Sequence, residues 1–291
     1  MLQHEKLLVL KRKKNSMAQK TNPIAFRLAA NKEKWFIKYH AKTQEEYSDY
    51  VYKNVKIREY LENIFNIFGC LIHTAFLKWT NNKLYITISY VVISNTKQQS
   101  LLKLPEKNIN NNRYLHFSTV FLDCLRGFTS NSIDIVLTLR KQNINFKSNI
   151  TKFQINYIKI LKIQLRQFSK YVFFKPLFNI LLLVSRLRNS ANLLAQYITN
   201  ELRLLKKHDL FLFVLKQLML RILKSKISKI KGIKVLIKGR LNNRPRASSW
   251  SLVVGKVPLQ TINAEISYNQ KIAYTKNGTL GIKVWVSENT L

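Results

Sequence analysis

The side chains that could do chemistry are not arranged for catalysis. The five histidines have no cysteine, aspartate or glutamate partner at the spacing of a metal site. The sequence also has no glycine-rich phosphate loop and no Gly-x-Ser-x-Gly turn that would present a serine nucleophile. Only 14 of 291 residues are acidic, which argues against a two-metal nuclease. We therefore expect no enzyme activity, catalytic residue, metal or cofactor; the histidines are His4, His40, His73, His116 and His208.

Positive charge is the chemistry that the chain does have. Lysine and arginine number 50, which gives a formal net charge of +36. Residues 135–200 and 210–264 contain no acidic residue at all. A soluble enzyme mixes both signs of charge over its surface, so these stretches indicate surface that lies against phosphate. Nucleic acid is the predicted partner, with a steep salt dependence, and an anionic membrane surface is the weaker alternative.

Composition also bounds the fold. A hydrophobic content of 46% in 291 residues is enough for two folded domains with real cores. The two cysteines, Cys70 and Cys124, are too few for a metal knuckle or a disulfide framework, and we expect them to be buried free thiols. The most apolar run, residues 171–184, is interrupted by polar residues and is too short to span a membrane. Residues 1–16 have the wrong order of apolar and basic residues for a secretory signal, so we interpret them as a basic arm.

The clearest binding surface is predicted near the C-terminus. Residues 233–240 alternate, with three aliphatic side chains on one face and Lys234, Lys238 and Arg240 on the other. This pattern indicates a half-buried strand with a basic open face. Pro245 ends the strand in a turn that carries further arginines. The candidate RNA-binding residues of this sheet and its turn are Lys234, Lys238, Arg240, Arg244, Arg246 and Lys256.

Further strands and two helices must hold this surface. The strands are predicted over residues 250–257, 262–268 and 282–286, with a turn just before the last. Apolar residues recur at helical spacing over 193–205 and 211–222, so we expect two helices on the apolar face of a four-stranded, mainly antiparallel sheet. Arg221 and Lys224 near the end of the second helix suit both the helix dipole and RNA, and both are candidate RNA-binding residues.

Upstream, the pattern predicts a helix, two strands, a helix and a strand, over residues 44–68, 71–80, 83–93, 114–128 and 132–140. Residues 143–189 then mix isoleucine, leucine, phenylalanine and lysine without a clear pattern. We interpret them as an insertion or linker, either unordered or folded against a partner, with a membrane-surface helix as the alternative.

Four sequence blocks carry a family resemblance: Gly232-Ile-Lys-Val, Gly239-Arg-Leu-Asn, the run from Gly255 to Tyr268 and the run from Gly278 to Val286. In order and spacing they resemble the C-terminal domain of the small-subunit ribosomal protein S-three family. The residues from Met17 onward are similar to the N-terminal arm of the same family. This resemblance implies that the first sixteen residues precede the family's usual start, and that Lys20 and Arg27 contact phosphate.

The resemblance also implies a type II KH domain, from which the chain departs. A KH domain holds single-stranded nucleic acid with a Gly-x-x-Gly loop. Residues 94–114 contain no glycine, and an Asn-rich loop at 108–112 stands in its place. We therefore expect a degenerate KH-like domain without that RNA clamp. In the family, basic residues on a C-terminal-domain helix line the channel where mRNA enters the small subunit. The matching residues 214–220 contain Lys216 as their only cation, so the location is implied but strong unwinding of mRNA is not.

These observations predict an α+β protein in four parts: a basic N-terminal arm (1–43), a KH-like domain (44–142), an insertion or linker (143–189) and a C-terminal domain (190–291). The predicted function is structural, in the head of the small ribosomal subunit. The implied partners are small-subunit rRNA, mRNA where it enters and neighbouring head proteins, with no small-molecule substrate. A composition rich in Ile, Asn, Lys and Phe indicates an organellar ribosome, mitochondrial rather than plastid. The alternatives are an RNA-processing factor of the maturase type and a membrane-associated assembly factor that uses residues 173–183.

Overall fold

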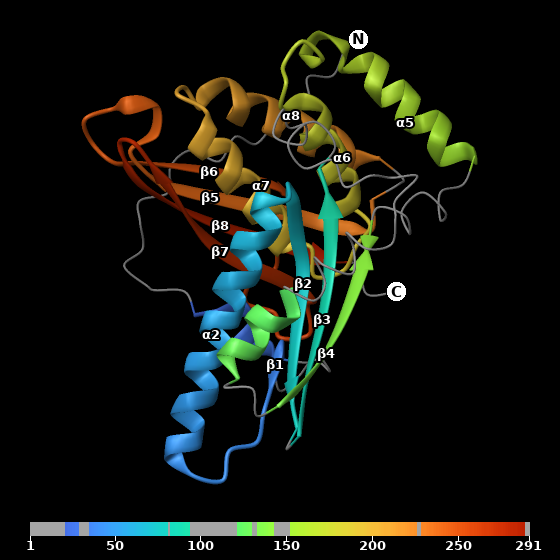
Figure 1. Cartoon of the computed structure of the whole chain (residues 1–291). Coiled ribbons are helices and arrows are strands. Elements are labelled where there is room, and N and C mark those ends of the chain that lie inside the picture. The colour runs from blue at the N-terminus through green and yellow to red at the C-terminus, as the bar shows by residue number, and fades with distance from the viewer. Residues whose placement is uncertain are drawn as a thin grey trace, which may run out of the picture.

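The computed structural model describes residues 21–28, 35–80, 82–93, 121–129, 133–142, 152–225 and 228–288. These residues form two four-stranded sheets, one from each half of the chain, with helices packed against both (Figure 1). Each sheet contributes to a hydrophobic core of its own. The predicted phosphate contact Lys20 and the Asn-rich loop at 108–112 lie outside the described residues.

The N-terminal sheet has the strand order β1-β2-β3-β4. β2 and β3 form the predicted antiparallel hairpin, and β4 runs parallel to β3. A two-residue strand, β1, pairs in parallel with β2 and is too short to leave a periodic signal in the sequence. The strands are β1 (Ile37–Lys38), β2 (Cys70–Trp79), β3 (Lys83–Val92) and β4 (Asp134–Lys141).

Two helices accompany this sheet, as predicted. α2 (Gln44–Ile67) buries Ile57 and Leu61 in the N-terminal core, and residues 121–128 are also helical. The predicted order of helix, strand, strand, helix and strand is therefore confirmed. One detail is wrong: the thiol of Cys124 is exposed, because it lies on the outer side of the second helix, whereas Cys70 is buried as expected.

The C-terminal sheet has the strand order β6-β5-β8-β7, and all its neighbours are antiparallel. α7 (Ala191–Leu204) packs on β7 and β8, and α8 (Asp209–Lys224) packs on β5 and β6. Two helices on one face of a four-stranded antiparallel sheet are what the sequence predicts. The strands are β5 (Ile230–Gly239), β6 (Ser248–Gly255), β7 (Ile266–Thr275) and β8 (Gly278–Glu288).

The third strand of this sheet differs from the prediction. Residues 262–264 form a turn, and β7 begins only at Ile266 and continues to Thr275. The physical reason is the preceding loop, whose backbone carbonyls at Leu259 and Thr261 accept hydrogen bonds from the guanidinium of Arg27. These bonds hold the loop against Arg27, and β7 begins only after the turn that follows this loop.

The insertion also differs from the prediction of a linker or a partner-bound segment. Its described part contains α5 (Lys152–Gln164), the short helix η2 (Arg166–Phe168) and α6 (Phe174–Val184). α6 packs against α7 and α8, and its apolar side chains belong to the same core as the C-terminal sheet. The folding reason is that eight of its eleven residues are apolar besides Pro176, which the first helical turn tolerates. None of the helices in the described ranges is both long and apolar enough to cross a membrane.

Candidate nucleic-acid interface

The face of the C-terminal sheet opposite its helices carries the predicted basic strand. Ile233, Val235 and Ile237 are at most 3% exposed on the helix side, so the alternating lysines of β5 point the other way. Antiparallel register sets Lys234 against Trp285, and Leu236 against Lys283 on the same face. We call Lys234, Lys238 and Lys283, with the neighbouring Tyr268 and Trp285, the basic sheet face.

Aromatic side chains organise the lysines of this face. The Nζ atom of Lys234 lies 5.1 Å from the ring centroid of Trp285, a cation–π contact. The rings of Tyr268 and Trp285 are 5.4 Å apart between centroids. Trp285 is only 6% exposed, so it supports Lys234 from beneath and does not offer a free ring to stack on a base. The face therefore presents ammonium groups to phosphate more than aromatic planes to bases.

The turn after β5 presents the predicted arginines at one end of the sheet. Arg244 and Arg246 are exposed, and the Nε of Arg240 donates a hydrogen bond to the Arg244 carbonyl. Asn242 has a positive φ of 54°, and its side-chain oxygen accepts a hydrogen bond of 2.7 Å from the backbone N–H of His208. The turn is therefore fixed to the start of α8, which holds the arginines in a defined place.

Lys256 lies at the opposite end of the sheet. Its backbone N–H donates to the carbonyl of Lys231, 3.1 Å away, where β5 and β6 approach closely. Gly255 allows this approach: its φ is +76°, and a Cβ there would lie 2.2 Å from the same carbonyl oxygen. Only glycine fits such a position without strain. The exposed ammonium group of Lys256 is thus placed by the backbone of the sheet.

The predicted residues of α8 occupy another surface. Lys216 and Lys224 are exposed on the outer side of the helix, whereas the basic sheet face lies on the far side of the same sheet. Arg221 is half-buried, and its Nη1 donates to the carbonyl of Gln164, 3.0 Å away. Val214 at the predicted mRNA-facing position is fully buried, so Lys216 is the cation that this part of α8 presents.

Arg27 lies in neither group. Its side chain is 1% exposed, and its guanidinium donates to the carbonyls of Pro258, Leu259 and Thr261 at distances of 2.6–3.2 Å. The predicted phosphate contact therefore has a structural role in this protein: it fixes α1 (Pro23–Arg27) to the loop before β7. The guanidinium is buried and donates five hydrogen bonds to backbone carbonyls, so none of its N–H groups faces solvent.

The sequence missed Lys283 and Tyr268 as members of the interface. Alternation along β8 placed Lys283 opposite the core, but its neighbours on β5 and β7 follow only from the strand register. Gln270 lies beside Lys283 in the register, so the basic sheet face extends onto the edge strand β7. Within the described ranges, no three His, Cys, Asp or Glu side chains gather as a metal site.

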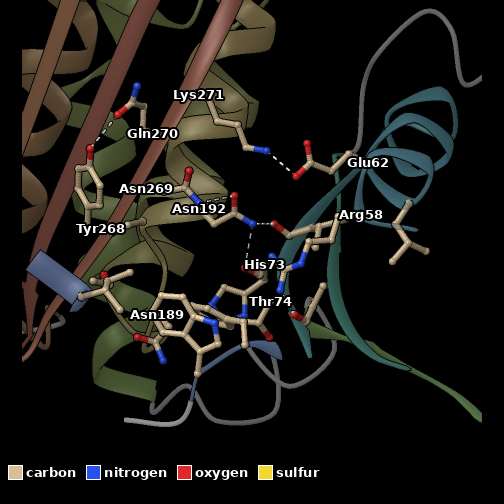
Figure 2. Close-up of a pocket in the computed structure, with 18 of the residues that line it drawn as sticks. Arg58, Glu62, His73, Thr74, Asn189, Asn192, Tyr268, Asn269, Gln270 and Lys271 are labelled. Carbon is tan, nitrogen blue, oxygen red and sulfur yellow. Dashed lines mark hydrogen bonds and ion pairs between the residues drawn. The ribbon is translucent and has the colours of Figure 1, made fainter. Parts of the chain in front are cut away.

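A cavity of about 190 Å³ lies where the two domains meet (Figure 2). Its wall includes the ion pair of Lys271 on β7 with Glu62 on α2, and an amide contact of 2.9 Å between Asn269 and Asn192. Burial lowers the pKa of Arg58 from its ordinary value, which the nearby Glu62 carboxylate partly offsets. The Lys271–Glu62 pair crosses the junction, and Asn192 also donates across it to the carbonyls of Ile72 and His73 on β2, so we interpret the cavity as a joint between the two halves of the protein.

Comparison with known proteins finds a family match over the region that contains the basic sheet face. A family model described as "Ribosomal protein S3, C-terminal domain" matches residues 205–286, which cover α8, β5, β6, β7 and all but the last two residues of β8. The small ribosomal subunit protein uS3c of Euglena longa is 28% identical over 274 residues, 94% of this chain and 100% of that protein.

Two further relatives match shorter regions. The uS3c protein of Tupiella akineta is 39% identical over 113 residues, 38% of this chain and 47% of the relative. The small ribosomal subunit protein uS3 of Fusobacterium nucleatum is 52% identical over 61 residues, 21% of this chain and 28% of the relative. In these two comparisons the chain therefore spans less than half of the relative's length.

Proposed function

We propose that this chain is a member of the ribosomal protein S3 family and a structural, non-catalytic protein of the small ribosomal subunit that binds small-subunit rRNA. The observation that carries this proposal is the family match over residues 205–286, the same region that presents the basic sheet face and its arginine turn. A net charge of +36 supports it, since stable RNA would neutralise a charge that otherwise repels itself.

The proposed RNA contacts divide into two groups of cations. The basic sheet face and the turn with Arg240, Arg244 and Arg246 form the first group, with Lys256 at the far end of the sheet. Lys216 and Lys224 on α8 form the second group, and we assign to them the weaker contact with mRNA where it enters the subunit. A rigid sheet fixes the backbone positions of these cations, so binding has to order only their side chains, at a cost of about 0.5–1.5 kcal/mol each.

We propose an organellar ribosome as the location. Two of the three relatives described above are named uS3c, the plastid-type form, and one of them matches over its full length. These names favour the plastid, whereas the composition rich in Ile, Asn, Lys and Phe predicted a mitochondrial location. Cell fractionation, with the protein detected by antibody in purified plastids and mitochondria, decides between the two organelles.

A charge-reversal experiment tests the RNA interface. The triple variant Lys238→Glu, Arg240→Glu and Arg244→Glu changes exposed side chains only, so the fold is expected to persist. We expect its incorporation into small subunits to fall at least about tenfold, because three attractive phosphate contacts become repulsive. A matched variant, Lys38→Glu, Lys78→Glu and Lys83→Glu, makes the same charge change at exposed lysines of the N-terminal sheet. Equal incorporation of the two variants would show that this face is not an RNA contact.

The two alternative functions predict other outcomes. A maturase-type factor would cleave or splice RNA in the presence of Mg²⁺, and purified protein assayed on intron-containing RNA tests this. A membrane-associated assembly factor would bind anionic liposomes in the absence of RNA. The apolar residues 173–183, on which that alternative rested, form the buried side of α6 and the turn before it, and this favours the ribosomal function.

A further inference from the structure

The turn between α5 and α6 forms a basic notch outside the interface described above. A notch of about 280 Å³ is lined by the end of α5, the residues after it and the first turns of α6. Three of its side chains are cationic, Lys162, Arg166 and Lys175. We call these three residues the insertion notch; the other lining residues are Ser169, Phe174, Phe178 and Asn179.

No acidic side chain in the described part of the chain forms an ion pair with this notch. The sequence from 135 to 200 contains no aspartate or glutamate, and none of the ion pairs between described residues includes Lys162, Arg166 or Lys175. Three like charges around one small space repel each other, so a bound anion would be stabilised there. The amide of Asn179 adds a neutral donor at the same rim.

The frame of the notch is rigid. Phe174 and Phe178, which line it, are 5% and 1% exposed because they pack in the C-terminal core. The Nζ atom of Lys162 lies 5.7 Å from the ring centroid of Phe178, which positions that ammonium group. The hydroxyl of Ser169 donates to the Arg166 carbonyl at 2.6 Å and closes the turn. The cations therefore project from a fixed backbone, as a preorganised anion site requires.

The insertion notch is joined to α8, one of the proposed RNA-binding elements, which packs beside α6 (Figure 1). Arg221 of α8 donates to the carbonyl of Gln164, which lies two residues from both Lys162 and Arg166. The rings of Phe168 and Phe213 also meet edge to face, with 6.1 Å between their centroids. The basic end of α8 and the notch are therefore parts of one continuous surface.

We propose that the insertion notch binds a phosphate of the RNA backbone, so that the insertion extends the RNA interface beyond the C-terminal sheet. The identity of the RNA rests on the proposed function above; the phosphate chemistry rests on the notch itself. Arginine and lysine together around one notch suit a phosphodiester, because the guanidinium can donate two bonds and the ammonium groups add charge. A lipid surface fits less well, since the aromatic floor is buried by the protein and offers no side chain for insertion.

The test compares full-length variants in their binding to a fluorescently labelled RNA hairpin over a series of KCl concentrations. The notch variant is Lys162→Gln, Arg166→Gln and Lys175→Gln. We expect the slope of log affinity against log salt to become shallower by about 0.7 to 0.9, because the notch variant loses one phosphate contact. The control variant, Lys152→Gln, Lys170→Gln and Lys207→Gln, makes the same charge change at exposed lysines outside the notch.

The possible outcomes distinguish the proposed phosphate site of the insertion notch from the proposed ribosomal function of the protein. Equal salt slopes for the notch and control variants would overturn the proposed phosphate site, even if the native protein still sediments with small subunits. Loss of binding to phosphatidylglycerol vesicles by the notch variant, with its RNA slope unchanged, would assign the notch to a membrane and also overturn it. We expect the melting temperature of the notch variant to stay level or rise, because repulsion is relieved; a marked fall would indicate a structural role instead.

Discussion

Arg27 shows that a basic residue in a highly charged chain can serve the fold. Its position after Asn-Pro suggested a phosphate contact, yet its guanidinium lies among the backbone carbonyls of the loop that precedes β7. The bond to Leu259 joins residues 232 positions apart in the sequence. A planar group with five donors suits such a cluster of carbonyls better than an ammonium group does.

Replacement of Arg27 by methionine should therefore destabilise the protein. The variant keeps most of the side-chain volume but leaves buried carbonyls without a donor, which costs about 1 to 3 kcal/mol. Urea denaturation measures this change in the free energy of unfolding. The exposed Lys38→Met serves as the control, with an expected effect within about 0.5 kcal/mol. If Arg27→Met instead kept full stability and reduced the salt slope of RNA binding, Arg27 would be a phosphate contact after all.

The strand β2 contains a bulge that joins the two domains. Its register with β3 shifts between Ile72 and Thr74, and the bulged backbone turns toward α7. There the side chain of Gln196 accepts from the Ile72 N–H at 3.0 Å, and Asn192 donates to the Ile72 carbonyl. The Nε2 of His73 donates to the carbonyl of Arg188, 2.9 Å away. A bulge thus converts strand backbone into an interdomain contact.

His73 should make the stability of this junction depend on pH. Burial lowers the pKa of His73 below its ordinary value of 6.5, although the bond to Arg188 partly offsets this. The unfolded chain then binds a proton more readily than the folded one, so stability is full above about pH 6.5 and falls as the pH drops below it. The raised pKa of buried Glu201 acts in the opposite direction and is common to all variants.

Urea midpoints at about pH 7.5 and about pH 5.5 test this assignment. We expect His73→Gln to lose less stability over that interval than the unmodified protein, because it has no imidazole to protonate. The exposed His40→Gln is the control and should behave like the unmodified protein. Identical losses for His73→Gln and the unmodified protein would rule out His73 as the source.

Sequence patterns predicted the elements whose signal is local. The alternation of Ile233, Val235 and Ile237 suffices to orient the lysines of β5, and helical spacing suffices for α7 and α8. The pattern of Ile262 and Ala264 also alternates, yet those residues form a turn directly after the loop that is held by Arg27. Contacts between distant segments decide such cases, and a single sequence does not contain them.

The same limit applies to the candidate site. Lys234 and Lys238 could be predicted because both lie on one strand, whereas the pairing of Lys283 with that strand needs the register. The insertion notch could not be predicted either, since Lys175 meets Lys162 and Arg166 only after α6 folds into the core. Long-range packing therefore creates the parts of the surface that periodicity leaves out.

In the whole molecule, cationic side chains from several helices and strands lie on two sheets that are joined to each other. α7 contacts strands of both sheets, Arg27 ties the arm to the C-terminal domain, and Lys271 pairs with Glu62 across the junction. A net charge of +36 on such a compact body produces strong self-repulsion in the absence of a polyanion. The proposed association with folded RNA would remove this repulsion and would account for the small number of acids that balance the lysines.

The decisive measurement is sucrose-gradient sedimentation of the native protein from its organelle, with and without ribonuclease. We expect the protein to migrate with the small ribosomal subunit and to leave that fraction once the RNA is digested, since phosphate contacts hold it there. Recovery of the protein as a soluble monomer at low ionic strength, separate from ribosomal particles before any digestion, would contradict the proposed function.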